Sequence, residues 1–278
     1  MRIDILSDLH INTYFNTDFD DNSIKLIYDP IFKKNNSNDK SDTLIIAGDL
    51  GHKNDQVIEF LKILKNRYYK YIICVLGNHD YYLVEEEDLK QYDSDSFKRT
   101  TELIDAINSL EDIYCLDGDI IEIEGIRFGG AMGWYDNSYA KEYFKDSSDD
   151  ISINTLWEKF SLDYKHIARI KSYDDLYKQE YPKLLRTHQE CDVFITHVNP
   201  SYKHEHINYV YHNNLTNCFF TFDGSTLAKN GSMKYWVFGH VHDAIEYELH
   251  GVKCICNPLG YPHESQYGQI TKLKTIVL

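Results

Sequence analysis

Five short stretches of this 278-residue sequence end in side chains that bind metal ions or transfer protons. In each of them, a run of apolar residues stops at Asp, His or Asn; the stretches are residues 3–10, 44–49, 71–80, 193–197 and 236–242. An apolar run followed by polar residues is typical of a buried strand that ends in a loop. Open α/β sheets place their chemistry at the carboxyl ends of such strands. The pattern therefore predicts one site to which five strands contribute.

The spacing between the second and third stretches indicates how they are positioned. Residues 44–47 and 71–76 have the composition of strands, and residues 56–64 between them carry apolar side chains at helical spacing. In a β-strand, helix, β-strand unit the two strands run parallel and end at the same edge of the sheet. We therefore expect Asp49 and the Asn78-His79 pair to lie at one edge.

The donors in these stretches are carboxylate oxygens, an amide oxygen and imidazole nitrogens, with no cysteine among them. Such a set favours Mn, Fe, Zn, Ni or Mg over the ions that prefer thiolates. Taken singly, Asp8 and Asp49 are also common turn or helix-cap residues, and His197 is a common hydrogen-bonded core residue. The occurrence of all five stretches in one chain favours a metal site.

Taken in order, the motifs resemble those of the calcineurin-like metallophosphoesterase superfamily. They are Asp8-x-His10, Gly48-Asp49, Gly77-Asn78-His79-Asp80, His197 and Gly239-His240-x-His242. The resemblance implies a four-layer αββα sandwich of two mixed β-sheets flanked by helices. It also implies two divalent ions, with manganese preferred: Asp8, His10 and His242 would hold the first ion, Asn78, His197 and His240 the second, and Asp49 would bridge them.

The resemblance further implies that His79 acts on the substrate and does not bind metal. We expect it to stabilise the phosphoryl charge or to protonate the leaving oxygen, with Asp80 orienting its imidazole. The alternative for Asp80 is a cap of the segment that follows. Among the other histidines, His204 and His206 are the best candidates for substrate contact, although surface or hydrogen-bonded roles are common for such residues.

The chain departs from one branch of the superfamily. Protein serine/threonine phosphatases carry Gly-Asp-x-x-Asp-Arg-Gly, whereas this chain has Gly48-Asp49-Leu50-Gly51-His52. The departure weighs against a protein phosphatase. The stretch from Gly77 to Tyr82 resembles a widespread bacterial and phage branch for which no single substrate is assumed.

The spread of the motifs and the net charge limit the possible domain organisation and the class of substrate. Motifs spread from end to end predict one domain over residues 1–278, with an insertion or cap around residues 137–190. We expect helices near 154–170 and 173–187, in which Trp157, Phe160 and Leu162 pack. The 29 Lys and Arg against 44 Asp and Glu give a net charge of −15, which disfavours a long nucleic-acid partner.

These observations predict hydrolysis of a small or nucleotide-like phosphoester, as a phosphatase or phosphodiesterase, by attack of metal-bound hydroxide. One alternative is a metal-dependent nuclease acting on nucleic-acid ends, for which a basic groove beside the metals would be the discriminating observation. The other is a non-catalytic metal-binding scaffold, and the presence of all seven ligand positions argues against it.

The sequence also bears on location. It has no apolar run of the roughly 20 residues needed to span a bilayer, and Met1-Arg2-Ile3-Asp4 leads directly into the first expected strand. Its six cysteines lack a C-x-x-C spacing and are expected to be buried free thiols. We therefore expect a cytoplasmic protein without a membrane partner.

Overall fold

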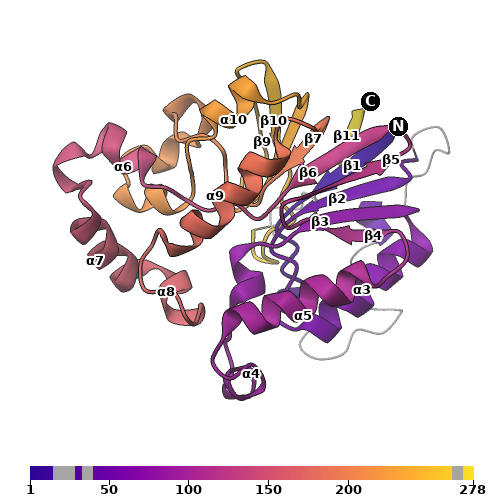
Figure 1. Ribbon diagram of the computed structural model, residues 1–278, viewed down its shortest axis with the longest axis horizontal. Coiled ribbons are helices and arrows are strands. Elements are labelled where there is room, and N and C mark those ends of the chain that lie inside the picture. The colour runs from indigo at the N-terminus through magenta and orange to yellow at the C-terminus, as the bar shows by residue number, and fades with distance from the viewer. Residues whose placement is uncertain (15–28, 33–39, 265–271) are drawn as a thin grey trace.

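The structure is a computed structural model that describes residues 1–14, 29–32, 40–264 and 272–278. Two β-sheets form its centre (Figure 1). The first sheet has the order β11 (Lys274–Val277), β1 (Arg2–Leu6), β2 (Thr43–Ala47), β3 (Tyr71–Val75) and β4 (Ile113–Cys115). The second has the order β5 (Asp119–Ile123), β6 (Ile126–Gly130), β7 (Val193–Ile195), β8 (Tyr235–Phe238), β10 (Val252–Cys256) and β9 (Ile245–Leu249).

The two sheets pack face to face because their strands are apolar on both faces. Alternate residues such as Ile3, Ile45 and Ile73 of the first sheet form one buried cluster with Val193 and Val237 of the second. The intervening residues of the first sheet face the helices instead, in a second cluster that contains Leu44, Ile46 and Ile72. Strands buried on both sides are the reason that the apolar runs are nearly continuous in the sequence.

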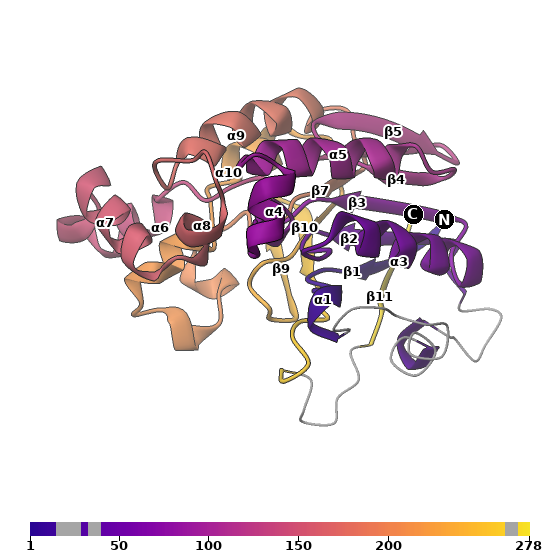
Figure 2. The same cartoon turned by 90° about the horizontal axis from the view of Figure 1, so that it is seen from below.

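Helices cover the outer faces of the sheets and complete four layers. On the first sheet lie α3 (Asn54–Arg67) and α5 (Ser96–Asn108), whereas α9 (Asp175–Thr187) contacts β5 and β6 of the second (Figures 1 and 2). Further helices include α1 (Ile11–Tyr14), α4 (Glu86–Gln91), α6 (Ser138–Tyr143), α7 (Asp150–Phe160), α8 (Leu162–His166) and α10 (Ser225–Asn230). Short 3₁₀ helices span η2 (Asn78–Tyr81), η3 (Lys145–Ser147), η4 (His204–His206), η5 (Tyr209–Tyr211) and η6 (Leu215–Phe219). The arrangement confirms the predicted αββα sandwich.

Parallel pairing brings the predicted strand ends to one edge. Strands β1, β2 and β3 are parallel neighbours, and so are β6, β7 and β8. Helices α6, α7 and α8 gather at the end of the molecule opposite the two termini (Figures 1 and 2). The carboxyl ends of β1–β3 therefore point toward the helices of the 137–190 region.

Three details differ from the sequence-based expectations. Asp-Gly and Glu-Gly between the apolar residues 113–116, 120–123 and 126–130 predict three consecutive paired strands, but β4 pairs in parallel with β3 and only β5 and β6 form a hairpin, in the other sheet. The single helix expected at 154–170 is divided into two helices, α7, which begins at Asp150, and α8. The division falls at Ser161, whose backbone is extended and whose side chain caps α8. Strand β11 was not predicted. Residues 12–42 are rich in Asn, Asp, Ser and Lys, a composition that predicts a long loop, and most of them lie outside the described residues.

All six cysteines are buried and free, as expected. Within the described ranges, no helix has both the length and the apolar character needed to cross a membrane.

Candidate metal centre

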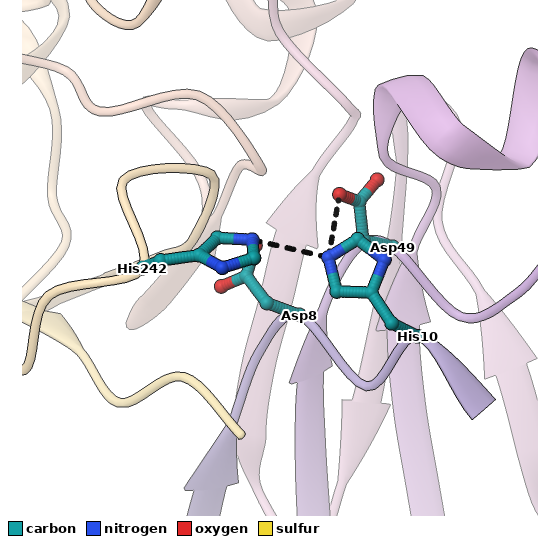
Figure 3. Close-up of side chains that lie close together, drawn as sticks. All are labelled: Asp8, His10, Asp49 and His242. Atoms are coloured by element: carbon teal, nitrogen blue, oxygen red, sulfur yellow. Dashed lines mark hydrogen bonds and ion pairs between the residues drawn. The ribbon is translucent and has the colours of Figure 1, made fainter. Parts of the chain in front are cut away.

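Two clusters of ligand-type side chains meet at the edge where the parallel strands end. The first contains Asp8, His10, Asp49 and His242, whose side chains point toward one another in Figure 3. The second contains Asp49, His197 and His240, and within each cluster the candidate ligand atoms lie within 4.8 Å of one another. Asp49 is the member that the two clusters share.

The two carboxylate oxygens of Asp49 face different clusters. Its Oδ2 lies 3.4 Å from Nε2 of His10, and its Oδ1 lies 3.3 Å from Nε2 of His197. In the first cluster, Nε2 of His242 is 3.0 Å from Nε2 of His10 and 3.6 Å from Oδ1 of Asp8. In the second, Oδ1 of Asn78 is 3.1 Å from Nε2 of His197. The geometry thus brings together all seven residues that the sequence indicated, and their role as ligands stays a prediction.

The backbone at these residues is unusual. Five of the seven have positive φ angles, a conformation that few residues other than glycine adopt: Asp8 (53°), His10 (43°), Asp49 (55°), His240 (70°) and His242 (51°). Such residues persist only where the surrounding structure holds them, and they concentrate at functional sites. Here Asp8 N donates to Gly48 O at 3.1 Å and His10 N donates to Asp49 O at 2.9 Å. The chain therefore accepts local strain in order to aim these side chains at one point.

Two glycines of the motifs lie so close to neighbouring backbone and carboxylate atoms that no larger residue fits there. A Cβ at Gly77 would collide with the backbone and carboxylate of Asp49. A Cβ at Gly239 would lie 2.7 Å from Ala47 O and 2.9 Å from Oδ2 of Asp8. Gly77 thus lets the loops that follow β2 and β3 of the first sheet lie against each other, and Gly239, which follows β8, lets the second sheet approach the ends of β1 and β2 in the first.

The four histidines of the two clusters differ in the direction in which their surroundings shift the pKa. Burial alone would lower the pKa of His197 and of His242, but the carboxylates of Asp49 and Asp8, respectively, raise each to about 9. Burial lowers the pKa of His10 well below its usual value, and burial together with His197 lowers the pKa of His240 to about 4. At neutral pH the protein without metal therefore holds two charged and two neutral imidazoles here.

The donor set fits divalent cations. Four imidazoles, two carboxylates and one amide oxygen converge, all of them buried or nearly so, and Nε2 of His10 lies 3.0 Å from Nε2 of His242. Oxygen and imidazole donors without a thiolate suit Mn, Fe, Zn, Ni or Mg. Divalent ions between these donors would take the place of the protons on His197 and His242.

Asp80 does not orient His79, contrary to our expectation. Its carboxylate accepts hydrogen bonds from the backbone N–H groups of Leu50 (3.0 Å), Gly51 (3.0 Å) and Gly77 (2.7 Å). The reason is its place at the third residue of η2, from which it turns back to cap the start of that helix. Burial and the nearby Asp49 raise the pKa of Asp80 to about 6. Asp80 therefore joins the loops that carry Asp49 and Asn78.

A buried arginine completes this junction from the other side. Arg99 of α5 donates to the backbone carbonyls of Gly51 (2.7 Å), His79 (3.1 Å) and Tyr82 (2.9 Å), and its side chain is fully buried. Asp80 thus binds the donors and Arg99 the acceptors of the same two loops. No periodicity or motif in the sequence marks Arg99 as a member of this junction.

His79 is held by a neighbour that sequence reasoning overlooked. Its Nδ1 lies 2.9 Å from Nε2 of His52, its Nε2 lies 3.4 Å from the hydroxyl of Tyr261, and its ring lies 4.3 Å from that of Tyr82. Burial lowers the pKa of His79 and, together with His79, lowers that of His52 to about 3. The only available signal for His52 was its position three residues after Asp49.

Asp163 of α8 is a second overlooked residue. It is buried, and its Oδ1 accepts from Nδ2 of Asn78 (2.8 Å) and from the hydroxyl of Tyr82 (2.7 Å). Its Oδ2 accepts from the hydroxyl of Tyr135 (2.8 Å). Because the amide nitrogen of Asn78 binds Asp163, the amide oxygen must face His197. The 137–190 region therefore contacts the site through the carboxylate of Asp163, which binds Asn78.

A cavity of about 880 Å³ opens over the clusters. Asp49, Asn78, His79, His240 and His242 are among the residues that line it. Trp157 packs in the core, as expected, and donates to the hydroxyl of Tyr135 at 2.7 Å. In contrast, Phe160 and Leu162 line the cavity and are partly exposed.

His204 and His206 do not line this cavity, contrary to the expectation of substrate contact. The ring of His204 stacks between those of Tyr143 (3.7 Å) and His212 (4.1 Å). His206 stacks on Tyr247 at 4.0 Å. Aromatic side chains of α6, of β9 and of their own segment therefore hold the two rings.

Comparison with known proteins agrees with this geometry. The family model for calcineurin-like phosphoesterases matches residues 1–244. The chain belongs to the calcineurin-like phosphoesterase family. Its reaction class is accordingly the metal-dependent hydrolysis of phosphoesters.

Two relatives illustrate the reach of the similarity. An uncharacterized protein of Acanthamoeba polyphaga mimivirus is 28% identical over 275 residues, which cover 93% of this chain and 91% of that protein. The crystal structure of the phosphopantetheinyl hydrolase of Mycobacterium tuberculosis superposes with a TM-score of 0.70 at 15% identity, and the alignment covers 99% of this chain and 95% of that chain. The second similarity is one of fold.

Asp163→Asn should weaken the second cluster. The substitution removes the charge that binds the amide nitrogen of Asn78, so we expect metal affinity or turnover to fall roughly 10- to 100-fold, the usual cost of losing such a supporting group. Metal titration monitored by calorimetry measures the effect. Asp146→Asn, at an exposed position of the same region, is the matched control. Equal behaviour of the two variants would contradict the role of Asp163.

Metal binding at neutral pH should release about two protons per chain, from His197 and His242, because a ligating imidazole must be neutral. Both pKa values lie above the unfolded value of 6.5. The stabilisation of the metal-free protein by these charges is therefore complete below pH 6.5 and is lost as the pH rises through about 9. Metal affinity rises over the same interval. Calorimetry in buffers of different ionisation enthalpy counts the protons, and a heat independent of buffer would contradict the expectation.

Proposed function

We propose that this chain hydrolyses a small or nucleotide-like phosphoester, as a phosphatase or phosphodiesterase, with two divalent ions. Asp8, His10 and His242 would hold the first ion, Asn78, His197 and His240 the second, and Asp49 would bridge them. The observation that carries the proposal is the placement of the two oxygens of Asp49 toward different clusters. Manganese is the ion we favour, and Fe, Zn, Ni or Mg suit the same donors.

The divalent ions supply, when bound, charge neutralisation at the phosphoryl oxygens and a water whose pKa is lowered toward ~7. The chain contributes only two carboxylates to the seven donors, so it leaves part of the metal charge uncompensated. A phosphate anion is thereby attracted to the floor of the cavity.

His79 acts on the substrate in this proposal as a neutral hydrogen-bond donor. Nδ2 of Asn12 donates to Nδ1 of His52 at 3.3 Å, so a neutral His52 carries its hydrogen on Nε2 and donates it to Nδ1 of His79. The hydrogen of a neutral His79 is then on Nε2. His79 lines the same cavity as Asp49 and His240, so this N–H can reach a phosphoryl or leaving oxygen there. Asp80 serves as a positioning residue, since its carboxylate binds the backbone of the loops that carry Asp49 and Asn78.

The charge of the cavity favours a small substrate over a long nucleic acid. Among the described residues, neither lysine nor arginine lines the cavity, so the basic groove expected beside the metals of a nuclease has no counterpart there. The net charge of −15 acts in the same direction.

We also propose that residues 1–278 form one domain with residues 137–190 as its cap. We further propose a cytoplasmic location, because six free thiols suit a reducing compartment.

His79→Asn should retain both ions and lower turnover of bis-p-nitrophenyl phosphate roughly 10²-fold or more, because a group that acts in the transition state is removable without dismantling the site. Asp49→Asn should lose metal and activity together, since both clusters share this carboxylate. Elemental analysis of the purified variants, with turnover measured in added Mn, separates the two outcomes.

His250→Asn, on an exposed turn, is the control and should behave as the unmodified chain. Equal metal loss in the His79 and Asp49 variants would show that His79 is a ligand. Activity that survives exhaustive chelation would overturn the metal-dependent proposal as a whole.

A further inference from the structure

The cavity over the clusters has a polar floor and apolar walls. Its floor contains the metal-ligand candidates Asp49, Asn78, His240 and His242, together with His79. Above them the wall is built from side chains of two separate segments, α7–α8 on one side and residues 207–220 on the other. A volume of about 880 Å³ lies within the range of small-molecule sites.

The walls present large apolar side chains to solvent. Phe160 and Leu162 are 57% and 49% exposed, and Tyr211 and Phe220, from the other segment, are 42% and 38% exposed. All four line the cavity. Apolar surface that stays exposed beside polar catalytic groups is typical of a binding site for an apolar part of a ligand.

The charged side chains of the walls are all acidic. Asp163, Asp243 and Glu264 line the cavity, whereas no lysine or arginine does so in the part of the chain that the structure describes. Asp163 already binds three donors, and Glu264 accepts from His242 and from the backbone N–H of Tyr261. An anionic group placed away from the metal ions would therefore meet carboxylates and no cation.

Neutral polar groups complete the lining. Asn208 and Thr216 offer an amide and a hydroxyl, which hydrogen-bond uncharged groups. Asn208 also donates to Oδ1 of Asp243 at 3.2 Å, so it keeps that carboxylate in place at the wall.

From these contacts we infer that the substrate carries a single anionic phosphoryl group, bound at the metals, and an uncharged, largely apolar organic group that lies against Phe160, Leu162, Tyr211 and Phe220. The inference rests on the proposed hydrolysis and names the class of its substrate. Nucleoside monophosphates and phosphate esters of uncharged alkyl or aryl groups belong to this class. Nucleoside di- and triphosphates and polynucleotide strands do not, because each places a further phosphate against the acidic walls.

Two esters that differ by one phosphate test the inference directly. Thymidine 5′-(p-nitrophenyl phosphate) and its 3′-phosphorylated form have the same leaving group and the same nucleoside. With the manganese-loaded enzyme, we expect kcat/KM to be at least about tenfold lower for the 3′-phosphorylated ester, since like charges across a site are strongly disfavoured. Equal or faster turnover of that ester would overturn the inference.

A positive charge placed in the wall should weaken the preference for the ester without the 3′-phosphate. Phe160→Arg should bring the two kcat/KM values several-fold closer together, because it supplies the missing cation. Ile151→Arg, on the same helix but 80% exposed and outside the cavity lining, makes the same change in net charge and should leave the ratio unchanged. Identical ratios in the two variants would show that the wall does not contact the organic group.

A binding measurement separates this inference from the proposed hydrolysis. Calorimetry with hexylphosphonate, a non-hydrolysable probe with one charged end, should show affinity that falls several-fold in Phe160→Ala and is unchanged in Ile151→Ala. Such binding without turnover of any ester would overturn the hydrolysis and leave the apolar wall in place. Turnover of esters with no effect of Phe160 on affinity or preference would overturn the wall and leave the hydrolysis.

Discussion

The architecture depends on one buried carboxylate that must face two clusters at once. Asp49 lies between His10 and His197, which follow strands of different sheets, and it has one oxygen toward each. The sharing requires the two sheets to approach closely at their carboxyl ends. Gly239, which follows β8 of the second sheet, permits that approach, because a Cβ there would collide with Ala47 O and the carboxylate of Asp8 in the first. The αββα packing thus serves to bring separate strand ends to a common acidic residue.

The residues around that carboxylate have an unusual, strained backbone conformation, and a buried network of polar side chains holds them in it. Asp49 and four of the other candidate ligands have positive φ angles. Asp80 accepts from the N–H groups of the adjoining loops while Arg99 donates to their carbonyls, so the loops are fixed on both sides. Asp163 adds the contribution of the 137–190 region by setting the orientation of Asn78. The site is therefore positioned by residues outside the motifs as much as by the motifs.

The αββα fold was implied by the resemblance of the motifs to a known family, whereas the meeting of the candidate ligands at one edge could be predicted from local patterns. Apolar runs mark the buried strands, and parallel pairing brings their polar ends together. His52 and Asp163 could not be predicted in the same way. Their partners, His79 and Asn78, lie 27 and 85 residues away, and no periodicity links them. The role of Asp80 was wrongly inferred because adjacency to His79 in sequence does not give adjacency of the side chains at the start of a 3₁₀ helix.

Anomalous X-ray diffraction from crystals grown with manganese would show whether Asp49 joins two metal ions. Two anomalous peaks are expected, about 3.5–4 Å apart as in other two-metal sites. One peak should contact Asp8, His10 and His242, the other Asn78, His197 and His240, and both should contact Asp49. A single peak, or two peaks of which only one contacts Asp49, would contradict the bridging role of Asp49.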